Sequence, residues 1–195
     1  MSTLLTKQER LDALYAPYKK CLECPLGFLG RKNVVFGEGN PDATLLFIGE
    51  APGKDEDLAG RPFVGQSGQL LNRALTLVGI ARADTFITNV VKCRPPNNRV
   101  PEPLEIGTCT NLLLFNQISI IQPRIICTLG AVALTTLLEK KAAITKMHGT
   151  PLSYKEGITL VPLYHPAYIL RNRTQATAWV EDFKVVASLL SNAKK

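Results

Sequence analysis

The sequence predicts an α/β fold, a three-layer α/β/α sandwich around a four-stranded parallel sheet. Four short apolar runs, at residues 44–48, 85–91, 124–129 and 159–164, are typical of strands, and a helical pattern follows each one. A strand–helix order repeated four times indicates a parallel sheet with helices on both faces. The length of 195 residues suits one unit of this kind, so we expect residues 1–195 to form a single domain.

Composition and charge narrow the class of protein. Apolar residues make up 46% of the chain, which is enough for an ordinary hydrophobic core. The net charge of +7 favours a polyanionic partner, above all a nucleic acid. The apolar runs are shorter than a membrane span requires, and the first 20 residues lack a secretory pattern. We therefore expect a cytoplasmic protein with no membrane-spanning segment.

Apolar spacing and capping residues predict the helices. Thr6 and Glu9 have the form of a capping box, which starts a helix that runs to about Lys19. Further helices are predicted at residues 70–78, 103–118, 131–138 and around 179–190. Glycine, proline and charged residues predict loops at 26–41, 50–57, 60–68 and 165–173, the first of them mostly loop or a short hairpin. Pro162 in the last strand indicates an edge position or a bulge.

Three polar side chains lie where predicted strands end. Glu50 follows the first strand, Asn89 lies at the end of the second, and His165 follows the fourth. The carboxyl ends of parallel strands share one rim of the sheet, where ligands of open α/β sheets bind. With Phe63 on a neighbouring loop, these groups suit a pocket for a flat polar heterocycle. The ring would stack on the heterocycle, the amide would read its edge, and the imidazole would bond an exocyclic oxygen.

Residues 49–54 only superficially resemble a phosphate-binding P-loop. That motif requires four residues between its glycines and Ser or Thr after the lysine. Here three residues separate Gly49 from Gly53, and Asp55 follows Lys54. Pro52 also removes a backbone N–H that would face phosphate. We therefore exclude nucleoside triphosphate binding at this loop.

Cysteine spacing indicates a metal site. The chain has five cysteines, an odd number, and structural disulfides are not expected in a cytoplasmic protein. Four thiolates, from Cys21, Cys24, Cys93 and Cys109, can hold either Zn²⁺ or an iron–sulfur cluster, and spacing alone does not choose between them. Cys127 lies among apolar residues of the third strand and is expected to be a small core residue.

The motifs resemble those of the family 4 uracil-DNA glycosylases, the iron–sulfur type of that superfamily. Residues 49–53 (Gly-Glu-Ala-Pro-Gly) are similar to the first active-site motif of the family, and residues 165–171 to the second. Residues 60–65 and 89–96 agree as well, as does the spacing of the four cysteines. Glu50 stands where family 5 enzymes typically have an apolar residue.

The resemblance implies a DNA repair activity. The expected reaction is hydrolysis of the N-glycosidic bond of deoxyuridine in single- or double-stranded DNA, which leaves an abasic site. Glu50 and His165 would be the catalytic residues, one acting on water and the other on the uracil oxygen. Phe63, Asn89, Gly49 and Glu56 would bind uracil, with Glu56 excluding thymine.

The resemblance also implies contacts outside the pocket. Leu170 (or Ile169) would fill the gap left by the extruded base, while Arg171 and Arg173, and also Arg31 and Lys32, would hold phosphates. The four cysteines would bind a [4Fe–4S] cluster, with zinc as the alternative, that joins the N-terminal segment to residues 93–109 of a monomer. Two other functions stay open: a broader glycosylase for hypoxanthine or xanthine, and a catalytically silent iron–sulfur DNA-binding protein.

Overall fold

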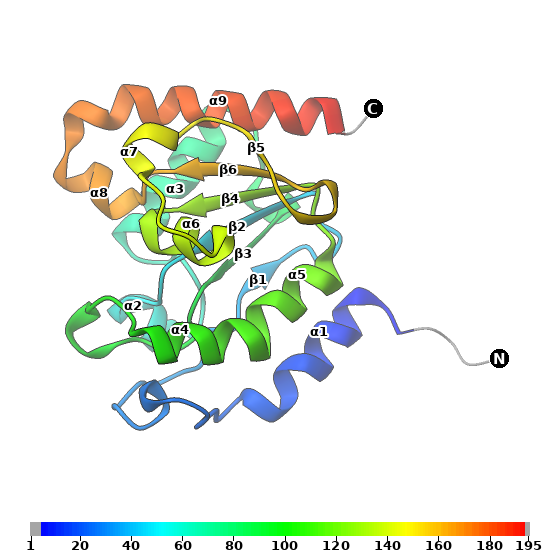
Figure 1. The fold of residues 1–195 in the computed structure, drawn as a ribbon, viewed down its shortest axis with the longest axis vertical. Helices are drawn as coiled ribbons and strands as arrows, with labels where there is room; N and C mark the ends of the chain where they lie inside the picture. Colours follow the sequence, from blue (N-terminus) through cyan, green and yellow to red (C-terminus); the bar gives the residue numbers. More distant parts are fainter. Residues whose placement is uncertain (1–4, 194–195) are drawn as a thin grey trace.

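The centre of the molecule is a parallel sheet that agrees with the predicted one. The computed structural model describes residues 5–193. Its four long strands are β2 (Leu45–Gly49), β3 (Thr85–Asn89), β4 (Ile125–Leu129) and β6 (Thr159–Leu163), and they pair in parallel in the order β3-β2-β4-β6. In Figure 1 the arrowheads of β4 and β6 point toward α8 (Pro166–Arg171).

The sheet of the described residues has six strands, so the prediction of four was incomplete. β1 (Glu38–Gly39) pairs antiparallel with β3, and β5 (Leu152–Ser153) pairs antiparallel with β6. Each of these edge strands has only two residues, too few to form an apolar pattern in the sequence. β5 reaches only Thr159 and Leu160 of β6, so Pro162 lies where β6 is itself the edge of the sheet and its missing N–H costs nothing.

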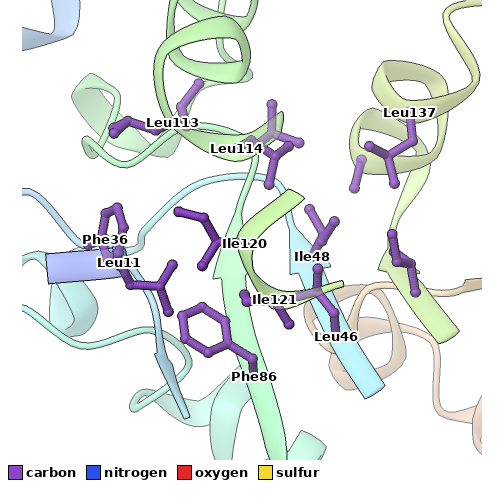
Figure 2. Close-up of a cluster of buried hydrophobic side chains, with 14 of the residues drawn as sticks. Leu11, Phe36, Leu46, Ile48, Phe86, Leu113, Leu114, Ile120, Ile121 and Leu137 are labelled. Carbon is purple, nitrogen blue, oxygen red and sulfur yellow. The ribbon is translucent and has the colours of Figure 1, made fainter. Parts of the chain in front are cut away.

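Helices cover both faces of the sheet, as predicted. The first face is covered by α1 (Lys7–Tyr15), α4 (Pro103–Cys109), α5 (Phe115–Ile121) and α6 (Ala131–Leu138). Figure 2 shows Leu113, Leu114 and Ile120 over Leu46, Ile48 and Phe86 of the sheet. The opposite face carries α3 (Gln66–Leu77) and α9 (Ala176–Ala193), whose Leu71, Leu75, Trp179 and Phe183 contact Phe47, Ile87 and Val161. Alternate residues of each strand thus enter alternate cores.

The crossovers create a topological switch point beside β2. The chain leaves β2, returns through α3 on one face to β3, and then returns through α4 and α5 on the other face to β4. Strand order therefore reverses at β2, and the two crossovers diverge beyond its carboxyl end. Such a divergence leaves a crevice at the strand ends, which is where ligands of doubly wound sheets bind.

Two predicted loops contain short helices. The acidic segment after β2 forms α2 (Lys54–Ala59), and α8 occupies most of residues 165–173. For α8 the prediction of a loop was wrong because proline at the first helical position is a start signal for a helix, not a break. His165 is the N-cap of α8 and Pro166 its first residue. A four-residue helix, α7 (Ile144–Met147), precedes β5.

The α4–α5 segment is more apolar than we expected. A π-helical turn, Thr110–Leu114, joins α4 to α5. Within residues 5–193, Pro103–Ile121 is the one helical segment that is long and apolar enough to cross a membrane, with a mean hydropathy of 1.2. Its residues Leu113, Leu114 and Ile121 are buried against the sheet, as in the core helix of a globular protein.

Candidate active site

The predicted site residues line one cavity at the carboxyl ends of β2, β3 and β6. The cavity has a volume of about 370 Å³, within the usual range for a small-molecule site. Its walls include the carboxylate, aromatic, amide and imidazole groups singled out in the sequence, namely Glu50, Phe63, Asn89 and His165. Glu56 and Arg171 also border it. These side chains come from separate elements and meet because the parallel strands end at one rim.

Asn89 lines the cavity and has a buried amide oxygen without a hydrogen-bond partner among residues 5–193. It is 1% exposed, and its Oδ1 has no hydrogen-bond partner in the described residues. A buried amide oxygen without a partner is costly unless a ligand supplies a donor. Gly49 pairs with Asn89 across the sheet, and a Cβ at Gly49 would lie 2.6 Å from Cζ of Phe63. Glycine at position 49 therefore lets the ring and the amide approach each other.

Phe63 forms a wall of the cavity although most of its surface is covered. The residue is 5% exposed, and its ring centroid lies 5.8 Å from that of His165. Its φ of 52° is in the left-handed region, which is unfavourable for a bulky side chain. Such strained backbone persists where surrounding contacts enforce it, often at a functional site. The strain here places an aromatic face on the cavity.

Glu56 borders the cavity, as its predicted contact with the base requires, and it also holds the Phe63 loop. Its Oε1 accepts the N–H groups of Val64 at 3.0 Å and Gly65 at 2.9 Å. Its Oε2 accepts the N–H of Gly53 at 3.1 Å. With three backbone donors, both carboxylate oxygens are already engaged. Glu56 is therefore a positioning residue that ties the start of α2 to the loop carrying Phe63.

His165 is held as a neutral imidazole. Its Nδ1 accepts the N–H of Ala167 at 3.1 Å, so Nδ1 carries no proton and the ring proton lies on Nε2. Burial, with a smaller effect of the Arg171 charge, lowers the pKa of His165 to about 4. The protonated ring would also lose the bond from Ala167. His165 therefore offers the cavity a neutral Nε2–H donor at physiological pH.

The pKa of Glu50 is shifted in the opposite direction to that of His165. Its side chain is half-buried at the end of β2, and burial raises the pKa of its carboxyl group above the ordinary value. A carboxylate with a raised pKa is a stronger base than a solvated one. The cavity thus combines a basic carboxylate with a neutral hydrogen-bond donor.

Of the predicted DNA contacts, Arg171 borders the cavity, and Leu170 and Arg173 lie close to Arg171 in the sequence. Leu170 is 40% exposed, whereas its neighbour Ile169 is 3% exposed and belongs to the core. Arg171 and Arg173 are exposed on the same segment. Arg31 does not fit the prediction of a phosphate contact, because its guanidinium donates to the carbonyl oxygens of Gly27 and Cys21, both at 2.6 Å.

The four predicted cysteine ligands border a second, smaller cavity. Cys21, Cys24, Cys93 and Cys109 line it together with apolar residues and Lys92. Burial raises the pKa of the Cys93 thiol to about 12 and that of Cys109 to about 11. In the described residues, no three His, Cys, Asp or Glu side chains are spaced closely enough to coordinate a single ion. Four thiols around one cavity are a donor set that suits either Zn²⁺ or an iron–sulfur cluster.

Sequence reasoning missed several residues of the base-sized cavity. Tyr168, Asn98 and Arg99 also line it, from α8 and from the segment after β3. The carboxylate of Glu105, with a fully buried side chain, binds Arg99 at 2.7 and 2.8 Å. The charge pair at positions 99 and 105 was the available signal, although such pairs are common on ordinary surfaces.

Comparison with known proteins identifies the family. Residues 36–185 match the family model of the uracil DNA glycosylase superfamily. A type-4 uracil-DNA glycosylase of Thermotoga maritima is 49% identical over 172 residues, which is 88% of each chain. Type-4 uracil-DNA glycosylases of Saccharolobus solfataricus and Sulfurisphaera tokodaii are 44% and 45% identical, over 94% and 96% of this chain and 88% of each relative. On this match and the cavity at its strand ends, the chain belongs to the uracil DNA glycosylase superfamily.

Proposed function

We propose that this protein removes uracil from DNA by hydrolysing the N-glycosidic bond, leaving an abasic site. The observation that carries the proposal is the set of four groups around one cavity, Glu50, Phe63, Asn89 and His165. The cavity, at about 370 Å³, is large enough for one base but too small to admit a duplex. The target nucleotide must therefore leave the base stack before it reacts, at a cost of roughly a few kcal/mol.

Asn89 and Phe63 recognise the base. The free Oδ1 of Asn89 accepts the N3–H of uracil, and its Nδ2 donates to O4. Cytosine carries an acceptor at N3 and a donor at C4, so it would leave both groups of the buried amide unpaired. Phe63 stacks on the ring, a contact worth on the order of 1–3 kcal/mol.

His165 stabilises the leaving group. As the bond between N1 and C1′ breaks, negative charge develops on uracil and on its O2 oxygen. The Nε2–H of a neutral His165 donates to that oxygen and needs no proton transfer to do so. Removal of one such preorganised donor costs about 2.7–4 kcal/mol in other enzymes.

Glu50 acts on the sugar side of the bond. In its ionised form it orients the attacking water and accepts its proton as the new C1′–O bond forms. Its negative charge also stabilises the oxocarbenium-like sugar. Burial raises the pKa of Glu50, which makes its carboxylate a stronger base than a solvated one and supports this role.

α8 and the residue after it contact the DNA around the extruded nucleotide. Leu170 is exposed and precedes Arg171, which borders the cavity, so it enters the gap in the base stack. Arg171 and Arg173 hold the flanking phosphates. Ile169, the other apolar candidate, is part of the core and has no such role.

The four cysteines hold a [4Fe–4S] cluster, which supplies a structural crosslink and no chemistry to the base pocket. Cys21 and Cys24 follow α1, while Cys93 follows β3 and Cys109 ends α4. Ligation joins the N-terminal segment to residues 93–109. The guanidinium of Arg31, bound to the Cys21 carbonyl, further orders the first pair.

A single-turnover assay on a uracil-containing oligonucleotide tests the proposal. Alkaline cleavage reveals each abasic site, and cytosine and thymine oligonucleotides of the same sequence are the controls. We expect strand cleavage at uracil alone. Activity on hypoxanthine or xanthine equal to that on uracil would indicate the broader glycosylase. Binding without cleavage would indicate a silent DNA-binding protein. Iron and zinc analysis of the purified protein tests the cluster.

A further inference from the structure

Lys92 is a fully buried lysine that bonds the residue proposed to read uracil. The residue is 0% exposed. Its Nζ donates to the backbone carbonyl of Asn89 at 2.6 Å and to Oγ1 of Thr88 at 2.7 Å. Lysine is almost never buried without a specific partner, so the full burial of Lys92 needs a structural explanation.

The direction of each hydrogen bond follows from the neighbouring groups. Oγ1 of Thr88 donates its only proton to the carbonyl of Phe36 at 2.8 Å, so it can only accept from Lys92. Lys92 and Thr88 thus form a directed chain to Phe36. In the described residues no carboxylate lies within ion-pair distance of Lys92. The amino group of Lys92 therefore bonds the backbone of Asn89 and not a carboxylate.

The backbone of Lys92 contacts the cysteine region. Its N–H donates to Sγ of Cys109 at 3.3 Å, and its carbonyl accepts the N–H of Val35 at 2.8 Å. Lys92 also lines the cavity of the four cysteines. One residue therefore touches both the proposed cluster site and the residue that ends β3 in the base pocket.

The orientation of the Asn89 side chain depends on its backbone. Its side-chain Oδ1 has no partner in the described residues, so the amide is aimed by the placement of its own backbone. Asn89 is the last residue of β3, and the peptide unit that follows it is held on both sides: the N–H of Val90 donates to the carbonyl of Gly49 at 2.9 Å, and the carbonyl of Asn89 accepts from Lys92. We infer that Lys92 is a positioning residue, which fixes the Asn89 carbonyl and thereby aims the amide at the edge of the base. This inference rests on the proposed uracil excision.

A double-mutant cycle tests whether Lys92 acts through Asn89. We measure single-turnover rate and KM on a uracil oligonucleotide for the wild type, Lys92→Met, Asn89→Ala and the double variant. In the wild-type background, Lys92→Met should lower kcat/KM by roughly 10–100-fold, mostly in kcat, because the buried hydrogen bond that holds the Asn89 carbonyl is lost. In the Asn89→Ala background the same substitution should cause no further loss.

Controls separate positioning from general damage. Iron content and the thermal midpoint are measured for every variant, and Lys184→Met, an exposed lysine on α9, should match the wild type in rate, iron and midpoint. Thr88→Val is the second variant if Lys92→Met does not fold, since it keeps volume and leaves Phe36 bonded by Gln117 at 2.9 Å. It should lower kcat/KM several-fold in the wild-type background and not in the Asn89→Ala background.

The possible outcomes decide between the inference and the proposed function. An equal loss in both backgrounds would mean that Lys92 supports the fold without aiming Asn89, which overturns the inference. No loss in the wild-type background overturns it as well. A wild-type protein that leaves uracil oligonucleotides intact contradicts the proposed function itself. The wild-type protein is therefore assayed before any variant.

Discussion

The two cavities of this molecule are built in different ways although both adjoin the end of β3. In the base pocket, backbone N–H groups already hold the side chains: Ala167 orients His165, and three donors hold Glu56. In the cysteine cavity, burial works against the form that binds metal, raising the pKa of Cys93 to about 12. The base pocket is thus set by the fold, whereas the proposed cluster would be needed to hold the four cysteines as thiolates. Substitutions in the first should change rates, and substitutions in the second should change stability.

The largest effect on rate is expected for His165→Ala. The substitution removes the Nε2–H donor that faces the developing uracil anion, so kcat/KM should fall by roughly 100–1,000-fold. The loss should lie in kcat, because the donor acts on charge that exists only in the transition state. Single-turnover kinetics on a uracil oligonucleotide measure it.

The other histidine provides the matched control. Nδ1 of His148 lies 2.8 Å from Oδ2 of Asp182, and its ring stacks on Tyr164, outside the base pocket. His148→Ala should therefore lower the thermal midpoint and leave kcat within a few-fold of the wild type. Equal rate losses in the two variants would show that imidazole removal acts through the fold, and the assigned role of His165 would be wrong.

The largest effect on stability is expected for Cys93→Ala. Cys93 is buried and lines the cavity of the four cysteines, so its loss removes one ligand of the proposed cluster. The protein should lose iron and brown colour, and its thermal midpoint should drop by several degrees or more. Any fraction that stays folded should keep the wild-type rate. Cys127→Ala is the control, since that buried thiol lies in β4, away from the cavity. A colourless, stable and fully active Cys93→Ala protein would exclude the structural cluster.

Sequence patterns were sufficient for the long elements and for the rim of the pocket. A continuous apolar run indicates a strand that is buried on both faces of a sheet. This pattern predicted the strands at residues 44–48, 85–91, 124–129 and 159–164. Glu50, Asn89 and His165 could be grouped because parallel strands bring their carboxyl ends together. The edge strands β1 and β5 could not be found, since two residues carry no periodicity.

Roles that depend on backbone partners could not be predicted from side-chain identity. The carboxylate of Glu56 was expected at the base, and only the positions of three N–H donors show that it holds a loop. Lys92 has no feature in the sequence that distinguishes it from a surface lysine. Arg31 was expected at phosphate for its charge, while its partners are two carbonyl groups. In each case tertiary geometry decides what a charged side chain does.

The pH dependence of the rate should separate the two catalytic groups. Burial raises the pKa of Glu50, so the rate should fall as the pH drops through a value above that of an ordinary glutamate, because the base becomes protonated. Burial lowers the pKa of His165 to about 4, so His165 should produce no transition between pH 6 and 8. Stability linked to His165 should also decrease as the pH falls from 6.5 toward 4, since the unfolded chain binds the proton more readily.

The variant Glu50→Gln assigns the acidic transition. Its residual activity should lose the transition that the wild type shows in kcat, while a transition linked to His165 would remain near pH 4. A wild-type profile with a transition at neutral pH that vanishes in His165→Ala would contradict the neutral imidazole. Rates are measured under single-turnover conditions, so that product release does not mask the chemical step.

The smallest effect is expected for Arg173→Ala, which changes the surface around the preformed pocket and leaves the pocket itself intact. Arg173 is exposed and outside the cavity, so its removal should leave kcat unchanged and weaken DNA binding only a few-fold at moderate salt. The informative quantity is the slope of log Kd against log salt, which should become shallower by up to about 1 for one lost phosphate contact. Lys184→Ala on α9 is the charge-matched control and should keep the wild-type slope. If Arg173→Ala and Lys184→Ala have the same slope, the positive charge of residue 173 acts only through the net charge of the protein. The proposed contact between Arg173 and a DNA phosphate would then be wrong.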